Sequence, residues 1–205
     1  MVNPFSIEEG RKDALFSRAI EKNAYLLENK SWAFWDLETT NLNASIGRVL
    51  CGTVYTEPSR YDTFSNWKDD RRTCVKIRDR LEQFDYAVSY NGLRFDLPYL
   101  NTRLLKHGER PLKPLRHVDL IWTARSALRL HSNRLQVVGQ TMLGVSGKTN
   151  LDGDIWGAAS VGDKAALAYI IEHCEADCLE LAKIFAILKD FRNLAATPLR
   201  GAYIG

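Results

Sequence analysis

Five residues with acid–base or metal-binding side chains lie in three separate stretches of the chain: Asp36 with Glu38, then Asp96, and last His173 with Asp177. Asp36 and Glu38 are two residues apart, so in extended backbone both side chains leave on the same side. Like charges that close repel each other and are hard to desolvate. A hard divalent cation such as Mg²⁺, which prefers carboxylate oxygen, would relieve that repulsion. Taken alone, the pair is equally typical of capping or loop acids at a strand end.

The other acids have simple structural interpretations as well. Asp96 follows a turn and precedes an expected helix, where an N-cap role would account for it. His173 and Asp177 are four residues apart, so they share one face of an expected helix. They lie beside Cys174 and Cys178 of an apolar stripe, which puts them on the flank of the buried face. A surface pair at the margin of that stripe is the alternative.

Together, four acids from a strand, a turn and a long helix could converge on two cations ~3.5–4 Å apart, an arrangement that clamps a phosphodiester. His173 is then the natural general base, since histidine titrates near working pH. With Cys174 and Cys178 it could instead form a zinc site, but the stripe favours the cysteines as small core residues. Asp119 is a fifth acid or a cap. Lys148 could contact a phosphate or simply be solvated.

The hydrophobic pattern predicts alternating strands and helices. Strands are expected over residues 32–36, 48–55, 61–67, 86–90 and 117–122, and helices over 73–84, 97–107, 135–143 and 162–190, with a loop over 145–162. This order predicts a mixed α/β layer fold. We expect one domain over residues 31–190, preceded by a helical extension over 1–30 and followed by a tail over 191–205.

Composition narrows the class of protein. The chain has 205 residues, of which 45% are hydrophobic and 26% charged, as in ordinary globular domains. No apolar run reaches the ~18 residues of a membrane span, so we expect no membrane partner. No secretion signal is visible at the start. Four cysteines are too few for a disulfide scaffold, so we expect reduced thiols and a cytoplasmic protein.

Positive charge is concentrated in one segment. The segment from Arg103 to Arg134 contains eight Lys or Arg residues and only two acids, Glu109 and Asp119. The net charge of the whole chain is only +3, so the remainder is slightly acidic. Such a segment favours a phosphate-rich partner. Long basic side chains that merely solvate helix faces would give the same pattern.

Three segments resemble the motifs of the DEDD exonucleases of the RNase-H-like superfamily. Asp36–Leu42 (DLETTNL) is similar to their first motif, Asp-x-Glu-Thr-Thr-Gly-Leu. Asn91–Leu100 (NGLRFDLPYL) is similar to the second motif of family-B DNA polymerase proofreading domains and of their stand-alone bacterial and viral relatives. The third motif falls at His173–Asp177. The matches span residues 31 to about 190, nearly the whole chain.

The resemblance implies an RNase-H-like fold, a five-stranded mixed sheet with helices on both faces. It also implies a metal-dependent 3′–5′ exonuclease that hydrolyses DNA or RNA to 5′-mononucleotides, and single strands with a 3′ end are the expected substrate. The implied ligands of two Mg²⁺ or Mn²⁺ ions are Asp36, Glu38, Asp96 and Asp177, with His173 as catalytic base. Asp36 would bridge both ions, and Asp96 would serve the second. The implied substrate contacts are Thr39, Thr40, Leu42, Asn91 and Phe95.

Two positions depart from the family pattern. Asn41 stands at the usual glycine place of the first motif. His173 stands four residues before Asp177, the tyrosine spacing of one subgroup, while Glu172 occupies the usual histidine position. The alternatives are therefore a catalytically silent nucleic-acid-binding module on the same fold and a structure-specific endonuclease. The N-terminal helix and C-terminal tail could dock a protein partner or pack on the domain.

Overall fold

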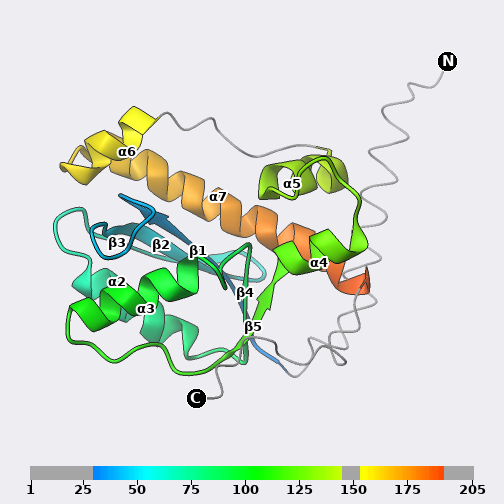
Figure 1. Cartoon of the computed structure of the whole chain (residues 1–205), viewed down its shortest axis with the longest axis horizontal. Coiled ribbons are helices and arrows are strands. Elements are labelled where there is room, and N and C mark those ends of the chain that lie inside the picture. The colour runs from blue at the N-terminus through cyan, green and yellow to red at the C-terminus, as the bar shows by residue number, and fades with distance from the viewer. Residues whose placement is uncertain (1–29, 145–152, 192–205) are drawn as a thin grey trace.

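A five-stranded mixed sheet forms the centre of the computed structural model, which describes residues 30–144 and 153–191. The strands are β1 (Trp32–Thr39), β2 (Val49–Thr56), β3 (Arg60–Ser65), β4 (Tyr86–Ser89) and β5 (Arg116–Asp119). Their order across the sheet is β3-β2-β1-β4-β5 (Figure 1). β1 pairs antiparallel with β2 and parallel with β4, so the first strand lies in the middle of the sheet.

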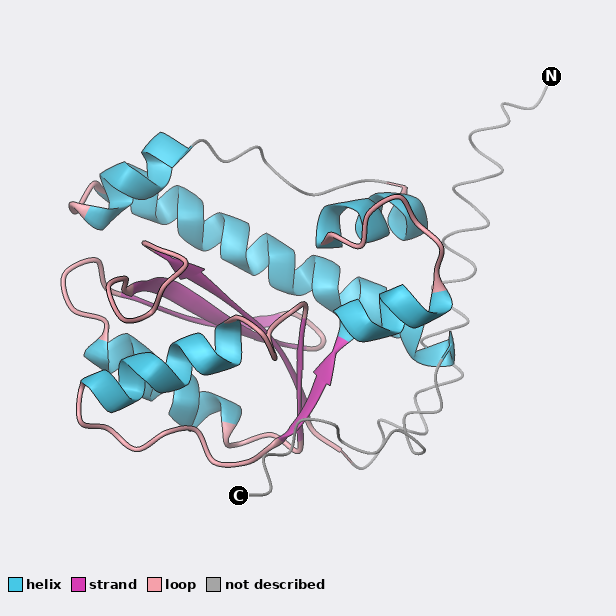
Figure 2. Ribbon diagram, in the orientation of Figure 1, coloured by secondary structure: helices cyan, strands magenta, loops and turns pink. Residues whose placement is uncertain are grey.

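Helices cover both faces of this sheet, as Figure 2 shows. They are α2 (Arg71–Leu81), α3 (Asp96–Lys106), α4 (Leu120–Ala127), α5 (Leu135–Leu143), α6 (Gly153–Ser160) and α7 (Lys164–Leu188), followed by a 3₁₀ turn at Lys189–Phe191. α2 and α3 pack on one face through a core that includes Ile77 and Leu100. α4, α5 and α7 pack on the other. The mixed sheet with helices on both faces is thus confirmed. None of the described helices is long and apolar enough to cross a membrane.

The long helix α7 is the element that the sequence pattern predicts best. Its stripe is buried as expected, with Cys174 and Cys178 fully inaccessible to solvent. The helix begins after Asp163, whose side chain accepts a hydrogen bond from the Ala166 amide at 2.8 Å. Gly162 precedes this cap with a φ of 101°, a conformation that glycine adopts without strain. The start and the buried face of α7 are therefore both encoded locally.

Three expected boundaries are wrong. β1 does not end at Asp36 but continues to Thr39, so Asp36 lies inside the strand. The strand expected over 117–122 ends at Asp119, because the Asp119 carboxylate accepts from the Ile121 amide at 3.2 Å and starts α4 there. The loop expected over 145–162 contains α6. That helix is held by tertiary packing: Ala159 is buried with residues of β2 and α7.

Some expectations fall outside the described residues. These are the helical extension over 1–30, apart from residue 30, the tail from residue 192, and Lys148. The division of the chain into a central domain with two appendages therefore stays a prediction.

A buried ion pair joins α3 to the segment between β1 and α2. The Arg103 guanidinium donates to both oxygens of Asp70 at 2.8 Å, and Asp70 is fully buried. Asp70 also accepts from the Val49 amide at 2.8 Å and contacts His107 Nε2 at 2.6 Å. Burial by itself would raise the pKa of Asp70, but these bonds outweigh it and lower the pKa below its usual value. Arg103 also donates to the Ala44 carbonyl at 3.2 Å, so the pair holds the loop after β1.

We expect Arg103→Met to lower the free energy of unfolding by about 3–5 kcal/mol, because it leaves the Asp70 charge buried without its partner. Urea unfolding followed by tryptophan fluorescence measures this loss. Arg71→Met is the matched control: Arg71 pairs with Glu109 at 2.8 Å but its side chain is 55% exposed, so the loss should stay below about 1 kcal/mol. Equal losses in the two variants would contradict the assignment.

Candidate active site

β1 presents two carboxylates to the face of the sheet that α7 covers. Asp36 and Glu38 alternate along the strand with the buried Trp35 and Leu37. The Cys174 thiol of α7 lies 3.5 Å from the Asp36 carbonyl oxygen and 3.7 Å from its carboxylate. The central strand and the long helix therefore meet at the first of the predicted site residues.

Three of the predicted site residues form one close group. The ligand atoms of Glu38, His173 and Asp177 all lie within 4.8 Å of one another. His173 Nε2 is 3.6 Å from Asp177 Oδ2 and 3.9 Å from Glu38 Oε1. His173 is only 5% and Asp177 9% exposed, so they are more deeply buried than a pair on the flank of a helix would be. Two carboxylates and an imidazole at these separations can share a divalent cation.

Asp36 and Asp96 complete the acidic cluster. Burial raises the pKa of the Asp36 carboxyl well above its ordinary value. Neighbouring groups that can carry negative charge raise it further; they belong to Cys174, Asp96, Glu38 and Asp177. Burial also raises the pKa of Asp96 to about 7. Asp36 is thus coupled electrostatically to the other three acids, beside the group that contains His173, and the repulsion among the acids favours a bound cation.

The loop before α3 is shaped to deliver Asp96. Asp119 accepts hydrogen bonds from the Asn91 amide at 2.7 Å and from the Leu93 amide at 3.1 Å. Asn91 has a φ of 64°, the left-handed conformation that asparagine tolerates. A Cβ atom on Gly92 would overlap the Ser89 side chain, so this turn requires glycine at position 92. Asp119 is therefore the cap expected of it, and it also anchors this loop.

Asp96 is not an N-cap, although its position before an expected helix in the sequence was consistent with that role. The N-cap position belongs to Phe95, and Asp96 is the first residue of α3. An acidic side chain in the first helical turn is favoured by the helix dipole. Its 3% exposure shows that it points inward rather than along the helix end. Phe95 packs against the Tyr99 ring with 5.4 Å between ring centroids, so its expected contact with a base stays a prediction.

The predicted substrate-contact residues after β1 lie in a hydrogen-bonded turn. Thr39 Oγ1 donates to the Asn41 carbonyl at 3.1 Å, and Thr40 Oγ1 accepts from the Arg48 amide at 3.0 Å. The Asn41 side chain accepts from the Asn43 amide at 2.8 Å. Asn41 does not adopt a positive φ, so the family's glycine is replaced by a side-chain-capped turn without strain. Leu42 is 82% exposed beside this turn.

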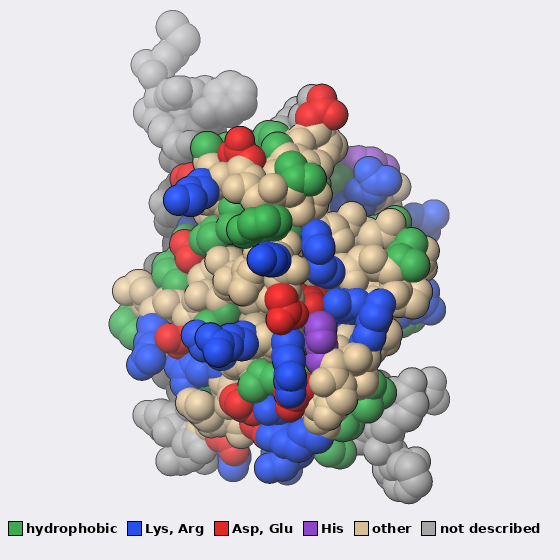
Figure 3. All heavy atoms as spheres, turned by 90° about the vertical axis from the view of Figure 1, so that its left-hand side faces the viewer, with side chains coloured by type: hydrophobic (Ala, Val, Ile, Leu, Met, Phe, Trp, Pro, Cys, Tyr) green, Lys and Arg blue, Asp and Glu red, His purple; other side chains and the backbone are tan. Residues whose placement is uncertain are grey.

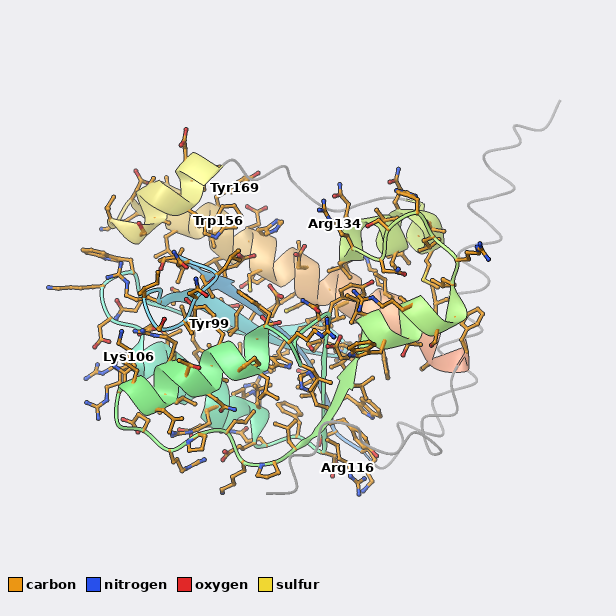
Figure 4. The ribbon with its side chains drawn as sticks, viewed as in Figure 1. Tyr99, Lys106, Arg116, Arg134, Trp156 and Tyr169 are labelled. Carbon is orange, nitrogen blue, oxygen red and sulfur yellow. The ribbon has the colours of Figure 1, made fainter. Side chains whose placement is uncertain are left out.

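Two neighbours of the site escaped sequence analysis. Trp156 lies edge-on to the His173 ring, with 6.4 Å between ring centroids and an interplanar angle of 82°. Figure 4 shows Trp156 on α6, the helix that was expected to be loop. The contact of Cys174 with Asp36 was also missed, since the apolar stripe indicated only a core role. In the described part of the chain, no three-ligand group includes a cysteine, which leaves the zinc interpretation without support.

Comparison with known proteins agrees with this geometry. The family model RNase_H_2, described as RNase_H superfamily, matches residues 33–189. The chain belongs to the RNase_H superfamily. It is 23% identical over 140 residues to a "DNA polymerase III PolC-type" of Ureaplasma parvum serovar 3, covering 55% of this chain and 10% of that protein. The family B DNA polymerase of the archaeon Pyrobaculum calidifontis has a similar structure, with a TM-score of 0.60, 19% identity and coverage of 76% of this chain and 24% of that one. This RNase_H-superfamily chain therefore spans only a small part of either relative.

Repulsion within the acidic cluster should lower the thermal stability of the metal-free protein. Without metal, we expect Asp36→Asn to raise the melting temperature by about 2–4 °C, equivalent to about 1 kcal/mol for a chain of this size, because one buried charge is removed. With Mn²⁺, the wild type should gain stability and the variant should gain less. Thermal unfolding with EDTA and with Mn²⁺ measures both effects. A destabilised variant, or an equal gain from Mn²⁺ in both proteins, would contradict the cluster as described.

Proposed function

We propose that the chain is a divalent-metal-dependent nuclease that removes nucleotides one at a time from the 3′ end of a nucleic acid and releases 5′-mononucleotides. The observation that carries this proposal is the close group of Glu38, His173 and Asp177, with Asp36 coupled electrostatically to Glu38, Asp177 and Asp96, on a chain of the RNase_H superfamily. The two similar proteins are DNA polymerases, which supports a nucleic acid as substrate.

The donor set fits hard divalent cations. Asp36, Glu38 and Asp177 would hold one Mg²⁺ or Mn²⁺ ion, and Asp36 with Asp96 would hold the second. Bound there, such ions offset the charge of the phosphodiester and activate water for attack. Their own charge would also return the Asp36 and Asp96 carboxyl groups to the ionised form that burial disfavours. The residues fit because every donor is a carboxylate and the group is largely shielded from water.

His173 would move the proton of the reaction. Its Nε2 atom faces the Asp177 and Glu38 carboxylates, where the attacking water would lie. In the proposed step the water oxygen bonds to phosphorus while its proton passes to His173 Nε2. The bond from phosphorus to the 3′ oxygen of the preceding nucleotide breaks, and that oxygen takes a proton from solvent. The edge-on contact with Trp156 restricts the rotation of the imidazole ring during this transfer.

A strand with a blocked 3′ end tests the direction of cleavage. We expect the purified protein to shorten a 5′-labelled single strand stepwise with Mg²⁺ or Mn²⁺, and to leave a strand with a 3′-terminal phosphorothioate cap intact. Gel electrophoresis resolves the ladder. Internal cleavage of the capped strand would indicate an endonuclease, and intact strands with both metals would refute the enzyme for these substrates. Asp36→Ala and Asp177→Ala should abolish cleavage and serve as controls against a contaminating nuclease.

The role of His173 has its own measurement. We expect His173→Ala to lower the turnover number by ~10²–10⁴-fold if its imidazole accepts the proton. The pH profile of the variant should then lose the limb that belongs to the base. Trp156→Leu is the companion variant, and it should give a smaller loss with the limb retained. A change of less than about tenfold in His173→Ala would move the residue to a supporting role.

A further inference from the structure

The basic segment singled out in the sequence divides into two parts in the structure. Its first part is neutralised: Arg103 pairs with the buried Asp70, and Arg110 and Lys113 reach Glu82 at 2.6 and 3.7 Å. Figure 3 shows the end of the molecule that carries the end of α3, where Lys and Arg side chains lie among Asp and Glu. Positive charge on this part of the segment is therefore largely compensated within the protein.

The second part of the segment has weaker compensation. Burial raises the pKa of Asp119 and the charge of Arg125 counteracts that rise, but the two form no ion pair. Over residues 30–144 and 153–191, no carboxylate forms an ion pair with Arg125, Arg129 or Arg134. Arg125 and Arg134 both line one open pocket of about 530 Å³, together with Tyr90, Asn91, Asn133 and Gln136 among others. None of the residues that line this pocket is acidic. Figure 4 shows Arg134 at the beginning of α5.

A tryptophan gathers positive charge at the edge of this pocket. The guanidinium carbons of Arg94 and Arg125 lie 5.0 and 5.2 Å from the centroid of the Trp122 ring. Cation–π attraction holds both side chains at the ring, which reduces the entropy that either would lose on binding a ligand. An anion near this ring would be attracted by both guanidinium groups.

One side of the pocket is formed by residues next to the loop that leads to Asp96, and a hydrogen bond holds this side in place. Tyr90 donates its hydroxyl to the Asn133 carbonyl at 2.7 Å, which ties β4 to the start of α5. Asn91 lines the pocket and begins the loop that delivers Asp96. The nearby Asp119 carboxylate accepts three backbone amides, from Asn91, Leu93 and Ile121, so its charge is already engaged.

We propose that this pocket binds a backbone phosphate of the single strand whose 3′ end occupies the active site. The inference rests on the proposed function and adds a second point of attachment to it. Guanidinium groups match the oxygens of a phosphodiester and read no base, so the pocket holds strands of any sequence. The scissile phosphate meets cations at the acidic cluster, whereas this phosphate meets arginines.

Binding of a single strand, measured without cleavage, tests the pocket. The proteins are the wild type, the double variant R125Q/R134Q and the control R129Q, which removes one exposed charge outside the pocket. Fluorescence anisotropy of a labelled oligodeoxynucleotide in Ca²⁺ gives Kd at several salt concentrations. We expect the double variant to bind about tenfold more weakly and its salt slope to fall by about 0.7, for one lost phosphate contact. R129Q should bind as the wild type does.

Three outcomes would overturn the inference. The first is wild-type affinity in R125Q/R134Q, and the second is an equal loss of affinity in R129Q. The third is displacement of the strand by inorganic phosphate at concentrations close to the Kd of phosphate for the protein, which would make the pocket a site for free anions. Circular dichroism checks that each variant is folded. Cleavage separates this inference from the proposed function. If no protein cleaves any strand, the nuclease assignment fails while the anisotropy still decides the pocket. If cleavage persists and the affinities agree, only the pocket fails.

Discussion

Mutual repulsion among four carboxylates is the constraint around which this fold is organised. In a flexible chain these acids, Asp36, Glu38, Asp96 and Asp177, would move apart. Here each belongs to a strand or helix that is held in place by its contacts. β1 is paired on both sides in the sheet. α3 is tied to the sheet through the buried Asp70–Arg103 pair. α7 packs its buried face across β1 and β2. Rigid packing thus holds together charges that only a cation would attract to the same point.

Much of the support for the site comes from groups that carry no reaction themselves. Asp119 binds the amides of the loop that leads to Asp96, and Asp70 binds the Val49 amide at the start of β2. Both acids accept backbone hydrogen bonds, so their charge is used for positioning. In the candidate site, by contrast, Glu38 and Asp177 lie close to each other and to His173. The same residue type therefore serves as anchor or as ligand according to the donors that surround it.

Positive charge is divided in a corresponding way. Arg103 and Arg110 are paired and contribute to the structure, while Arg125 and Arg134 face an open pocket beside the loop of Asp96. A single count of basic residues along the segment combines these two groups, although only one is available to a ligand. Membership of the RNase_H superfamily fits a phosphodiester as the partner of both the acidic cluster and the basic pocket.

The sequence alone determined the elements whose signals are local. The periodic apolar stripe predicted α7, the hydrophobic pattern predicted α5 over residues 135–143, and the spacing of Asp36 and Glu38 placed both on one face of β1. Motif order was enough to single out the five candidate site residues. Tertiary structure decided the remainder: the order of the strands, the helix at α6, the contact of Trp156 with His173, and which arginines are paired. These depend on contacts between residues far apart in the chain, so burial and charge partners come from packing that no local pattern encodes.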